Sequence, residues 1–224
     1  MLFRSDLAKL VKSLWGDATY APAPFNFPEF GEFYDAKVAP KYGYNIEAAK
    51  AFLRKSSYRG EQLVVNVTRG AVPNFDLAVE YMAEQWNALG IKVKLNVVDS
   101  WPLALQHPFD LLNMSMDVAF DSSPTRAIWG FWGPESARAT READRSWTPP
   151  AAFIEKGKKY LEAVDFAERK RLFREMVDIW EDEMPALIVW RNIANWVSQD
   201  RVKWTPITDV SIFCGPEYLR FAAR

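Results

Sequence analysis

The sequence is poor in the residues that most catalytic and metal sites require. Among its 224 residues there is one histidine, His107, and one cysteine, Cys214. A single thiol excludes an internal disulfide, and it cannot anchor a zinc site alone. A Ser-His-Asp triad would have to use His107, and no Gly-x-Ser-x-Gly elbow occurs. We therefore expect no metal site, and these absences argue against an enzyme of the common hydrolase types.

Glycine-rich phosphate-binding loops are also absent. The chain has 10 glycines, and neither a Gly-x-Gly-x-x-Gly nor a Walker pattern occurs among them. Gly70 stands alone as a turn glycine between a predicted strand and a predicted helix. The common nucleotide-binding folds are therefore excluded, and we expect no cofactor.

Neither sign of charge dominates, and no long apolar run occurs. Lys and Arg number 28 against 29 Asp and Glu, so the chain lacks the positive field that a nucleic acid or an anionic membrane requires. No run of 18 apolar residues predicts a membrane span. The N-terminus, residues 1–6, lacks the pattern of a signal peptide. We expect a cytosolic chain or a mature piece of a longer exported precursor.

Apolar residues at helical spacing predict helices in six segments. Ser5 and Asp6 can cap the first, Asn45 the second and Asn74 the third, because their side chains accept from free backbone N–H groups. Pro185 stops the last helix, because proline cannot continue it. The predicted helices span residues 7–15, 46–54, 74–89, 124–132, 151–162 and 166–183.

β-branched runs and alternating patterns predict strands between these helices. The clearest is 91–98, where apolar residues alternate with Lys92, Lys94 and Asn96. Strand 61–67, helix 74–89 and strand 91–98 form a βαβ unit with parallel strands, which indicates an α/β fold. Further strands are expected at 109–116, 186–190 and 193–197. Residues 16–44 and 133–150 are expected to be irregular, the first pinned to a surface by its aromatic residues.

Segment 117–134 is the most concentrated candidate for a binding surface. It follows a predicted strand, and open α/β sheets bind ligands beyond the carboxyl ends of their strands. Arg126 could pair with an anionic group, and the two tryptophans could stack on a ligand. The tryptophans could equally be core anchors of a short helix. The candidate ligand-binding residues are Asp117, Asp121, Arg126, Trp129, Phe131 and Trp132.

Two other functions remain open on the residues alone. Asp117 and Asp121 could serve a hydrolase as acid and base, if their carboxyl groups lie about 5–10 Å apart across a pocket. An interaction module without a ligand would instead expose a broad apolar patch.

Several motifs follow one another along the chain in a specific order and spacing. They are the helix start at 3–7, the block 42–53 with Tyr58-Arg59-Gly60, the strand-helix-strand unit ending in Leu89-Gly90-Ile91-Lys92-Val93, Phe109-Asp110, Arg171-Leu172 and Glu183-Met184-Pro185-Ala186-Leu187. Taken together, these motifs resemble the family 5 extracellular solute-binding proteins, the dipeptide- and oligopeptide-binding components of ABC importers. The resemblance covers essentially the whole chain, and it is the order and spacing of the motifs that make it specific.

The resemblance implies a fold and a division of the chain. It implies a periplasmic-binding-protein-like lobe with a mixed sheet flanked by helices. Family members are about twice as long or longer, so this chain would be only the C-terminal part. Residues 1–195 would form the second lobe, and residues 196–224 would be a return segment that crosses to an absent first lobe.

The resemblance also implies a function and partners. The intact protein would capture a small solute between two lobes and deliver it to the membrane permease of an ABC importer, from the periplasm or the cell surface. The ligand would be a small molecule or peptide, and the family also binds opines, sugars and chelates. Peptide-binding relatives hold the amino terminus with an aspartate in a Trp-x-x-Asp…Asp-Pro segment. Here the tryptophan is replaced, and either Asp117 or Asp121 could be that aspartate.

Overall fold

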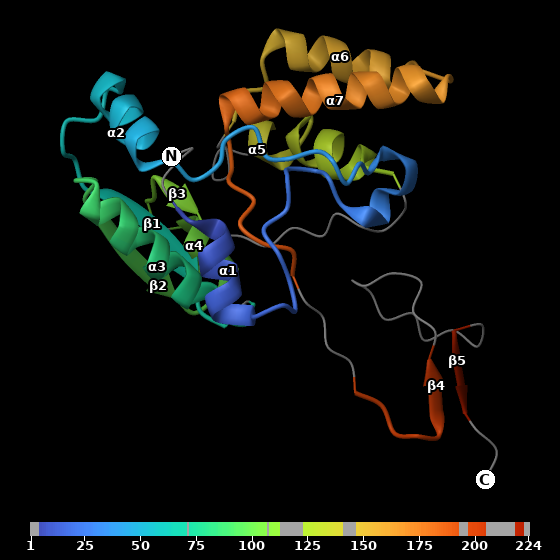
Figure 1. Cartoon of the computed structure of the whole chain (residues 1–224), viewed down its shortest axis with the longest axis horizontal. Coiled ribbons are helices and arrows are strands. Elements are labelled where there is room, and N and C mark those ends of the chain that lie inside the picture. The colour runs from blue at the N-terminus through green and yellow to red at the C-terminus, as the bar shows by residue number, and fades with distance from the viewer. Residues whose placement is uncertain are drawn as a thin grey trace.

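The computed structural model describes residues 5–70, 72–106, 108–112, 123–140, 147–192, 197–204 and 218–221. Its elements form a small sheet with helices on both faces and, beside it, a group of helices that includes a long antiparallel pair (Figure 1). In chain order they are α1 (Leu7–Trp15), η1 (Pro28–Phe33), α2 (Ile46–Lys55), β1 (Leu63–Thr68), α3 (Phe75–Ala88), β2 (Val93–Val98), α4 (Trp101–Gln106), β3 (Leu111–Leu112), η2 (Arg126–Gly130), α5 (Ala137–Thr140), α6 (Ala151–Glu162), α7 (Phe166–Glu183), β4 (Val202–Trp204) and β5 (Leu219–Phe221).

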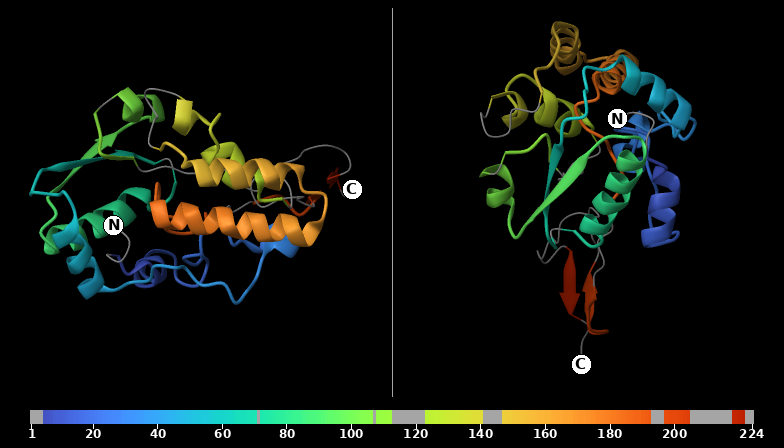
Figure 2. Two further views of the ribbon diagram at one scale, coloured as in Figure 1. Left: turned by 90° about the horizontal axis from the view of Figure 1, so that it is seen from above. Right: turned by 90° about the vertical axis from the view of Figure 1, so that its left-hand side faces the viewer.

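The sheet has the order β2-β1-β3 and is parallel throughout. Val65 of β1 lies between Leu95 of β2 and Leu111 of β3. Helix α3 covers one face with α1 packed beside it, and α4 covers the other (Figure 2). The parallel pair β1 and β2 with its crossover helix α3 confirms the predicted βαβ unit.

The two faces of β1 differ in chemistry because side chains alternate along a strand. Val65 and Val67 face α3 in a sheet cluster, which comprises Leu10, Val65, Val67, Ala78, Val79, Met82, Trp86 and Ile91. Asn66 is fully buried on the face toward α4. Its amide nitrogen donates to the Ala104 carbonyl oxygen at 2.6 Å, and its oxygen accepts from Asn96 at 2.8 Å. Both ends of the buried amide are thus satisfied, which removes most of its desolvation cost.

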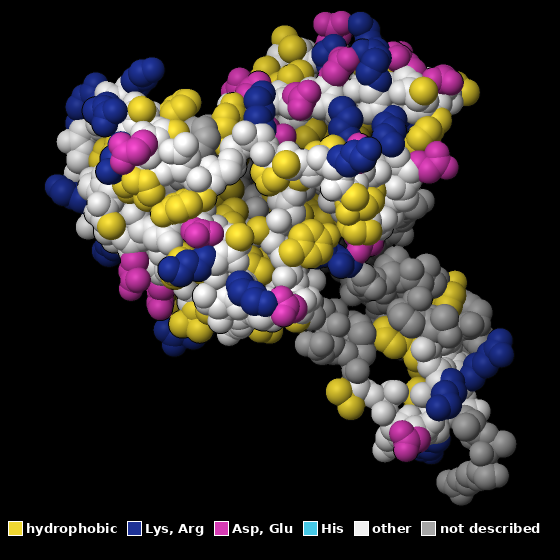
Figure 3. Space-filling model, viewed as in Figure 1, with side chains coloured by type: hydrophobic (Ala, Val, Ile, Leu, Met, Phe, Trp, Pro, Cys, Tyr) yellow, Lys and Arg dark blue, Asp and Glu magenta, His cyan; other side chains and the backbone are white. Residues whose placement is uncertain are grey.

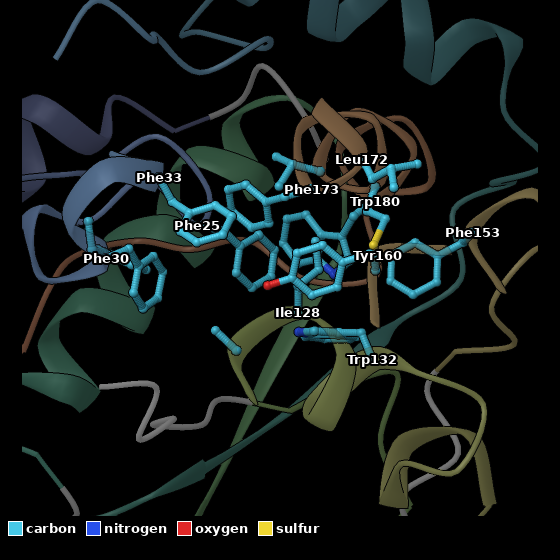
Figure 4. Close-up of a cluster of buried hydrophobic side chains, with 14 of the residues drawn as sticks. Phe25, Phe30, Phe33, Ile128, Trp132, Phe153, Tyr160, Leu172, Phe173 and Trp180 are labelled. Carbon is cyan, nitrogen blue, oxygen red and sulfur yellow. The ribbon is translucent and has the colours of Figure 1, made fainter. Parts of the chain in front are cut away.

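The second group of helices surrounds an aromatic cluster (Figure 4). Phe25 meets Trp180 edge to face at 4.9 Å, and Phe33 meets Phe173 at 5.4 Å. The predicted pinning of segment 16–44 by its aromatic residues is therefore confirmed. The cluster comprises Phe25, Phe27, Phe30, Phe33, Ala127, Ile128, Trp132, Trp147, Phe153, Tyr160, Leu172, Phe173, Met176, Val177 and Trp180.

The predicted helix caps are confirmed at two of three positions. Asp6 accepts from the Lys9 backbone N–H at 2.9 Å, and Asn45 accepts from that of Ala48 at 2.9 Å. Asn74 precedes α3 as predicted, but it has a left-handed backbone and its side chain does not cap the helix. Its amide nitrogen donates to the Leu14 carbonyl oxygen instead, at 3.2 Å, and so connects α3 to the end of α1.

The strand predicted at 186–190 is wrong. The expected mixed sheet is likewise not found, because the three-stranded sheet of the described residues is parallel. The segment has no strand assignment, and its side chains contact two separate clusters. Val197 also lies outside any strand, and the rest of the strand predicted at 193–197 lies outside the described residues. The run of apolar residues reflects contacts with two cores, which need no neighbouring strand.

Strands β4 and β5 form a separate antiparallel pair, with Lys203 opposite Arg220. They lie apart from the sheet and the helices (Figure 1).

Figure 3 shows Lys, Arg, Asp and Glu side chains mixed over the upper helices on one face of the molecule. On the described stretches of the chain, no helix is both long and apolar enough to cross a membrane.

The buried face of α7 offers a test of the aromatic cluster. Val177 is 4% exposed, whereas Val164, just before the same helix, is 98% exposed. Val177→Ala should lower the free energy of unfolding by about 2 kcal/mol, from two lost methyl groups and the cavity they leave. Val164→Ala should change it by less than about 0.5 kcal/mol. Equal effects in urea denaturation would contradict this packing.

The Glu181 carboxylate offers a test by pH. Burial raises its pKa, with nearby Asp178 and Asp182 acting in the same direction, while Lys41 opposes the shift. The folded pKa of Glu181 is raised, so its protonated carboxyl group stabilises the folded state. This contribution is fully present below the unfolded pKa of about 4.3, and it is lost as the pH rises through the folded pKa. The Lys41 backbone N–H donates to the Glu181 carboxylate at 3.0 Å. A glutamine at position 181 still offers an oxygen to accept this hydrogen bond, but it cannot ionise.

The glutamine variant should therefore gain stability relative to the wild type as pH rises from about 4 to 7. Denaturation midpoints measured across that range check the prediction. The exposed Glu183→Gln, at the end of the same helix, is the matched control. A difference between Glu181→Gln and the wild type that stays constant with pH would contradict the burial argument.

Candidate functional site

The described part of the candidate segment is a short helical stretch placed against α6. It begins at Ser123, passes through η2 and ends with α5. Asp117 and Asp121 lie outside the described residues, so their separation, on which the hydrolase alternative depends, is not given by the structure. The predicted short helix at 124–132 is confirmed, because the backbone is helical from 125 to 132 and includes η2.

Element η2 is a π-helical turn. The Phe131 backbone N–H donates to the Arg126 carbonyl oxygen, five residues earlier, in place of the usual four. Such turns insert one extra residue into a helix and rotate the side chains that follow, and they are frequent at functional sites. The sequence pattern predicted a helix here but carried no signal for this wider turn.

Two arginines flank Phe131 and place positive charge on an aromatic surface. The exposed Arg126 guanidinium carbon lies 5.8 Å from the Phe131 ring centroid, and that of the buried Arg138 lies 5.3 Å from it. Arg138 also lies 5.3 Å from the Trp132 ring. These are cation–π distances. Arg126 and Phe131 were candidates from the sequence, but Arg138 was not, because it lies in the stretch 133–150 that was expected to be irregular.

Trp129 is half-buried and held against α6. Its ring stacks on Phe153, with centroids 6.1 Å apart and planes 17° from parallel. A Cβ atom added at Gly157 would overlap Trp129 Cζ3 and Cε3 and would lie 2.8 Å from Cη2. A Cβ atom at Gly133 would lie 2.5 Å from the Trp129 carbonyl oxygen. Two glycines thus make room for this side chain and its backbone.

Trp132 is a core anchor of the short helix, which was the alternative to a ligand-stacking role for the two tryptophans. Only 2% of it is exposed. Its ring centroid lies 5.6 Å from that of Trp147 and 5.4 Å from that of Trp180, within the aromatic cluster (Figure 4). Because protein side chains enclose the ring, Trp132 has no face free for ligand stacking in this structure. It anchors the turn that bears Arg126 and Trp129.

Thr125, the residue before η2, joins the turn to both long helices through hydroxyl groups. Its Oγ1 lies 2.7 Å from Ser123 Oγ and 2.8 Å from the Tyr160 hydroxyl of α6. Arg169 of α7 donates to the same oxygen at 3.4 Å and lies 5.1 Å from the Tyr160 ring centroid. None of these four residues was predicted as part of a site.

A helical pattern in α6 could have pointed to this arrangement. Phe153, Gly157 and Tyr160 are spaced i, i+4 and i+7, so they share one face, and all three are buried. A glycine in the middle of a helix is unfavourable on its own, so one on a buried face indicates a close neighbour.

The described residues bring the exposed Arg126 together with the half-buried rings of Trp129 and Phe131. A guanidinium group can pair with an anion and an aromatic ring can stack on a planar group, which is the chemistry that such a surface offers. Within the ranges that the structure describes, no three His, Cys, Asp or Glu side chains are grouped as a metal site.

Comparison with known proteins identifies the fold. The model of the bacterial extracellular solute-binding proteins, family 5 Middle, matches residues 4–138. No curated protein sequence is significantly similar to the chain.

Several solved structures share the architecture at low sequence identity. The substrate-binding protein CtaP of Listeria monocytogenes aligns with a TM-score of 0.69 and 15% identity, over 85% of this chain and 39% of its own. NikZ of Campylobacter jejuni, solved with Ni(L-His), gives 0.65 and 12%, over 84% and 40%. The oligopeptide-binding protein AppA of Bacillus subtilis, solved with a nonapeptide, gives 0.67 and 17%, over 84% and 40%.

The chain therefore spans about two fifths of the length of these structures. Its parallel sheet flanked by helices matches part of the periplasmic-binding-protein fold, in agreement with the expected α/β class. The matched family consists of solute-binding proteins, which are transport components and not enzymes. Since the family model covers more than half of the 224 residues, this chain belongs to the family 5 bacterial extracellular solute-binding proteins.

Proposed function

We propose that this chain is the C-terminal lobe of the substrate-binding component of an ABC import system. The intact protein captures a small solute between two lobes and passes it to a membrane permease from the periplasm or the cell surface. The observation that carries the proposal is the family match over residues 4–138. A single lobe supplies only part of the contacts to such a ligand, and hinge closure supplies the rest.

The division of the chain into a lobe (1–195) and a return segment (196–224) is part of this proposal. Strands β4 and β5 are three residues each, and an isolated two-stranded pair is marginally stable in water. Phe221 of β5 is 68% exposed. Both features favour a further lobe that packs against this pair.

We place the ligand surface on Arg126, Trp129 and Phe131, with Trp132 as a buried anchor of the same helical stretch. Asp117 and Asp121, which lie outside the described residues, belong to the proposed site from the sequence alone. The cation and the rings suit a ligand with an anionic group next to an apolar or planar part. A peptide carboxylate fits this description, and so does an opine or a chelate. Among the similar structures, AppA is solved with a nonapeptide and NikZ with Ni(L-His), so the shared fold leaves the ligand class open.

The test is native mass spectrometry of the polypeptide that contains this chain, purified from its source without denaturation. A ligand should appear as added mass that is lost on denaturation, and its fragments identify its class. Arg126→Ala should weaken binding of that ligand roughly tenfold to hundredfold, because a hydrogen bond to a charged group contributes about 1.5–3 kcal/mol.

The matched control is Arg54→Ala, an exposed arginine in the last turn of α2. It should leave affinity unchanged. If the source protein carries no added mass and binds nothing from a mixture of synthetic peptides, opines, sugars and metal chelates, capture of a solute is wrong. If both variants bind equally well, the assignment of the surface at Arg126 is wrong.

A further inference from the structure

We propose that helix α6 sets the position of Trp129, with Gly157 and Tyr160 as its positioning residues. This inference deepens the proposed function, because it names the residues that orient the candidate ligand surface without touching the ligand. It rests on three contacts that one face of α6 makes with a single short stretch of chain.

The first contact is steric. Gly157 is buried in the middle of α6, and the six-membered ring of Trp129 occupies the space that a side chain there would fill. Alanine is favoured over glycine inside a helix by backbone entropy. The glycine is therefore costly for α6 alone, and the space that it leaves for the indole offsets this cost.

The second contact fixes the plane of the ring. Phe153 lies one helical turn before Gly157 on the same face, and its ring is nearly parallel to that of Trp129. With one face on Phe153 and an edge at Gly157, only the remaining, partly exposed side of the indole is available to a ligand.

The third contact fixes the start of the turn. Tyr160, with 0% exposure, presents its hydroxyl to Thr125 Oγ1 at 2.8 Å. Arg169 of α7 lies over the Tyr160 ring and donates to the same oxygen. Since Thr125 directly precedes η2, this network holds the backbone from which Arg126 and Trp129 project.

Together the contacts fix both ends of η2 against α6. Phe153 and Gly157 hold the indole, while Tyr160 holds the backbone four residues earlier in the chain. A change at Gly157 or Tyr160 should therefore rotate or release Trp129 and alter which ligand groups can stack on it.

The test uses the full chain labelled with 5-fluorotryptophan, and the fluorine resonance that disappears in Trp129→Phe is assigned to Trp129. Gly157→Ala should shift that resonance and lower the Tm by roughly 4 °C or more. The matched control is Gly43→Ala, because nothing lies within 4 Å of a Cβ atom there. It should leave the Trp129 resonance in place.

Rescue separates positioning from general damage to α6. Phenylalanine at position 129 lacks the ring atoms that the added methyl group would meet, so Gly157→Ala should cost little Tm in the Trp129→Phe background. Tyr160→Phe removes only a hydroxyl group and should also shift the Trp129 resonance. Its matched control is Tyr81→Phe, a half-buried tyrosine of α3 beside the sheet cluster.

Two results would overturn the proposal. One is a Trp129 resonance that moves no further in Gly157→Ala and Tyr160→Phe than in their controls. The other is a Tm loss in Gly157→Ala that persists without Trp129. Neither measurement needs a ligand, so failure of the proposed solute capture, detected by mass spectrometry, remains distinguishable from failure of this inference.

Discussion

Segment 186–190 contacts both hydrophobic clusters of this protein and so ties the group of helices to the sheet. Ala186 and Ile188 contact the aromatic cluster, whereas Leu187, Val189 and Trp190 contact the sheet cluster. From Ala186 to Val189 the contacts alternate between the two clusters, so one short segment belongs to two cores at once. The segment leaves the end of α7 and runs beside α1, where Trp190 packs on Trp15 with centroids 4.6 Å apart (Figure 1).

Polar contacts secure the far end of that segment. The Arg191 side chain pairs with Glu29, and its backbone N–H donates to the Tyr20 carbonyl oxygen at 3.3 Å. The Thr19 hydroxyl donates to the Arg191 carbonyl oxygen at 2.5 Å. The irregular chain after α1 is thereby tied to the chain after α7. Because that irregular chain also supplies Phe25 and Phe33 to the aromatic cluster, the group of helices that carries the candidate site has a defined place beside the sheet.

The regular elements could be predicted closely because their signals are local. Asp6 and Asn45 cap helices where predicted, and Gly90, with φ of 86°, follows α3 in the left-handed conformation that glycine adopts without strain. The candidate site could be predicted only in part. Arg126 is exposed and Trp129 and Phe131 are half-buried, so they stay candidates for ligand contact, but Trp132 is a core residue. Trp129 and Trp132 look alike in sequence, and only their neighbours, Gly157 for one and Trp180 for the other, distinguish them.

The sequence by itself determined the α/β class, the βαβ unit, most helix ends and the family resemblance, since spacing, caps and turn residues act over a few positions along the chain. The tertiary structure alone decided which tryptophan is buried, that segment 186–190 joins two cores without a strand partner, and that Tyr160 and Gly157 hold η2. These outcomes depend on contacts between residues that are far apart in sequence. A glycine on the buried face of a helix indicates a close neighbour, but nothing in the sequence identifies that neighbour as a tryptophan about thirty positions earlier until the chain packs.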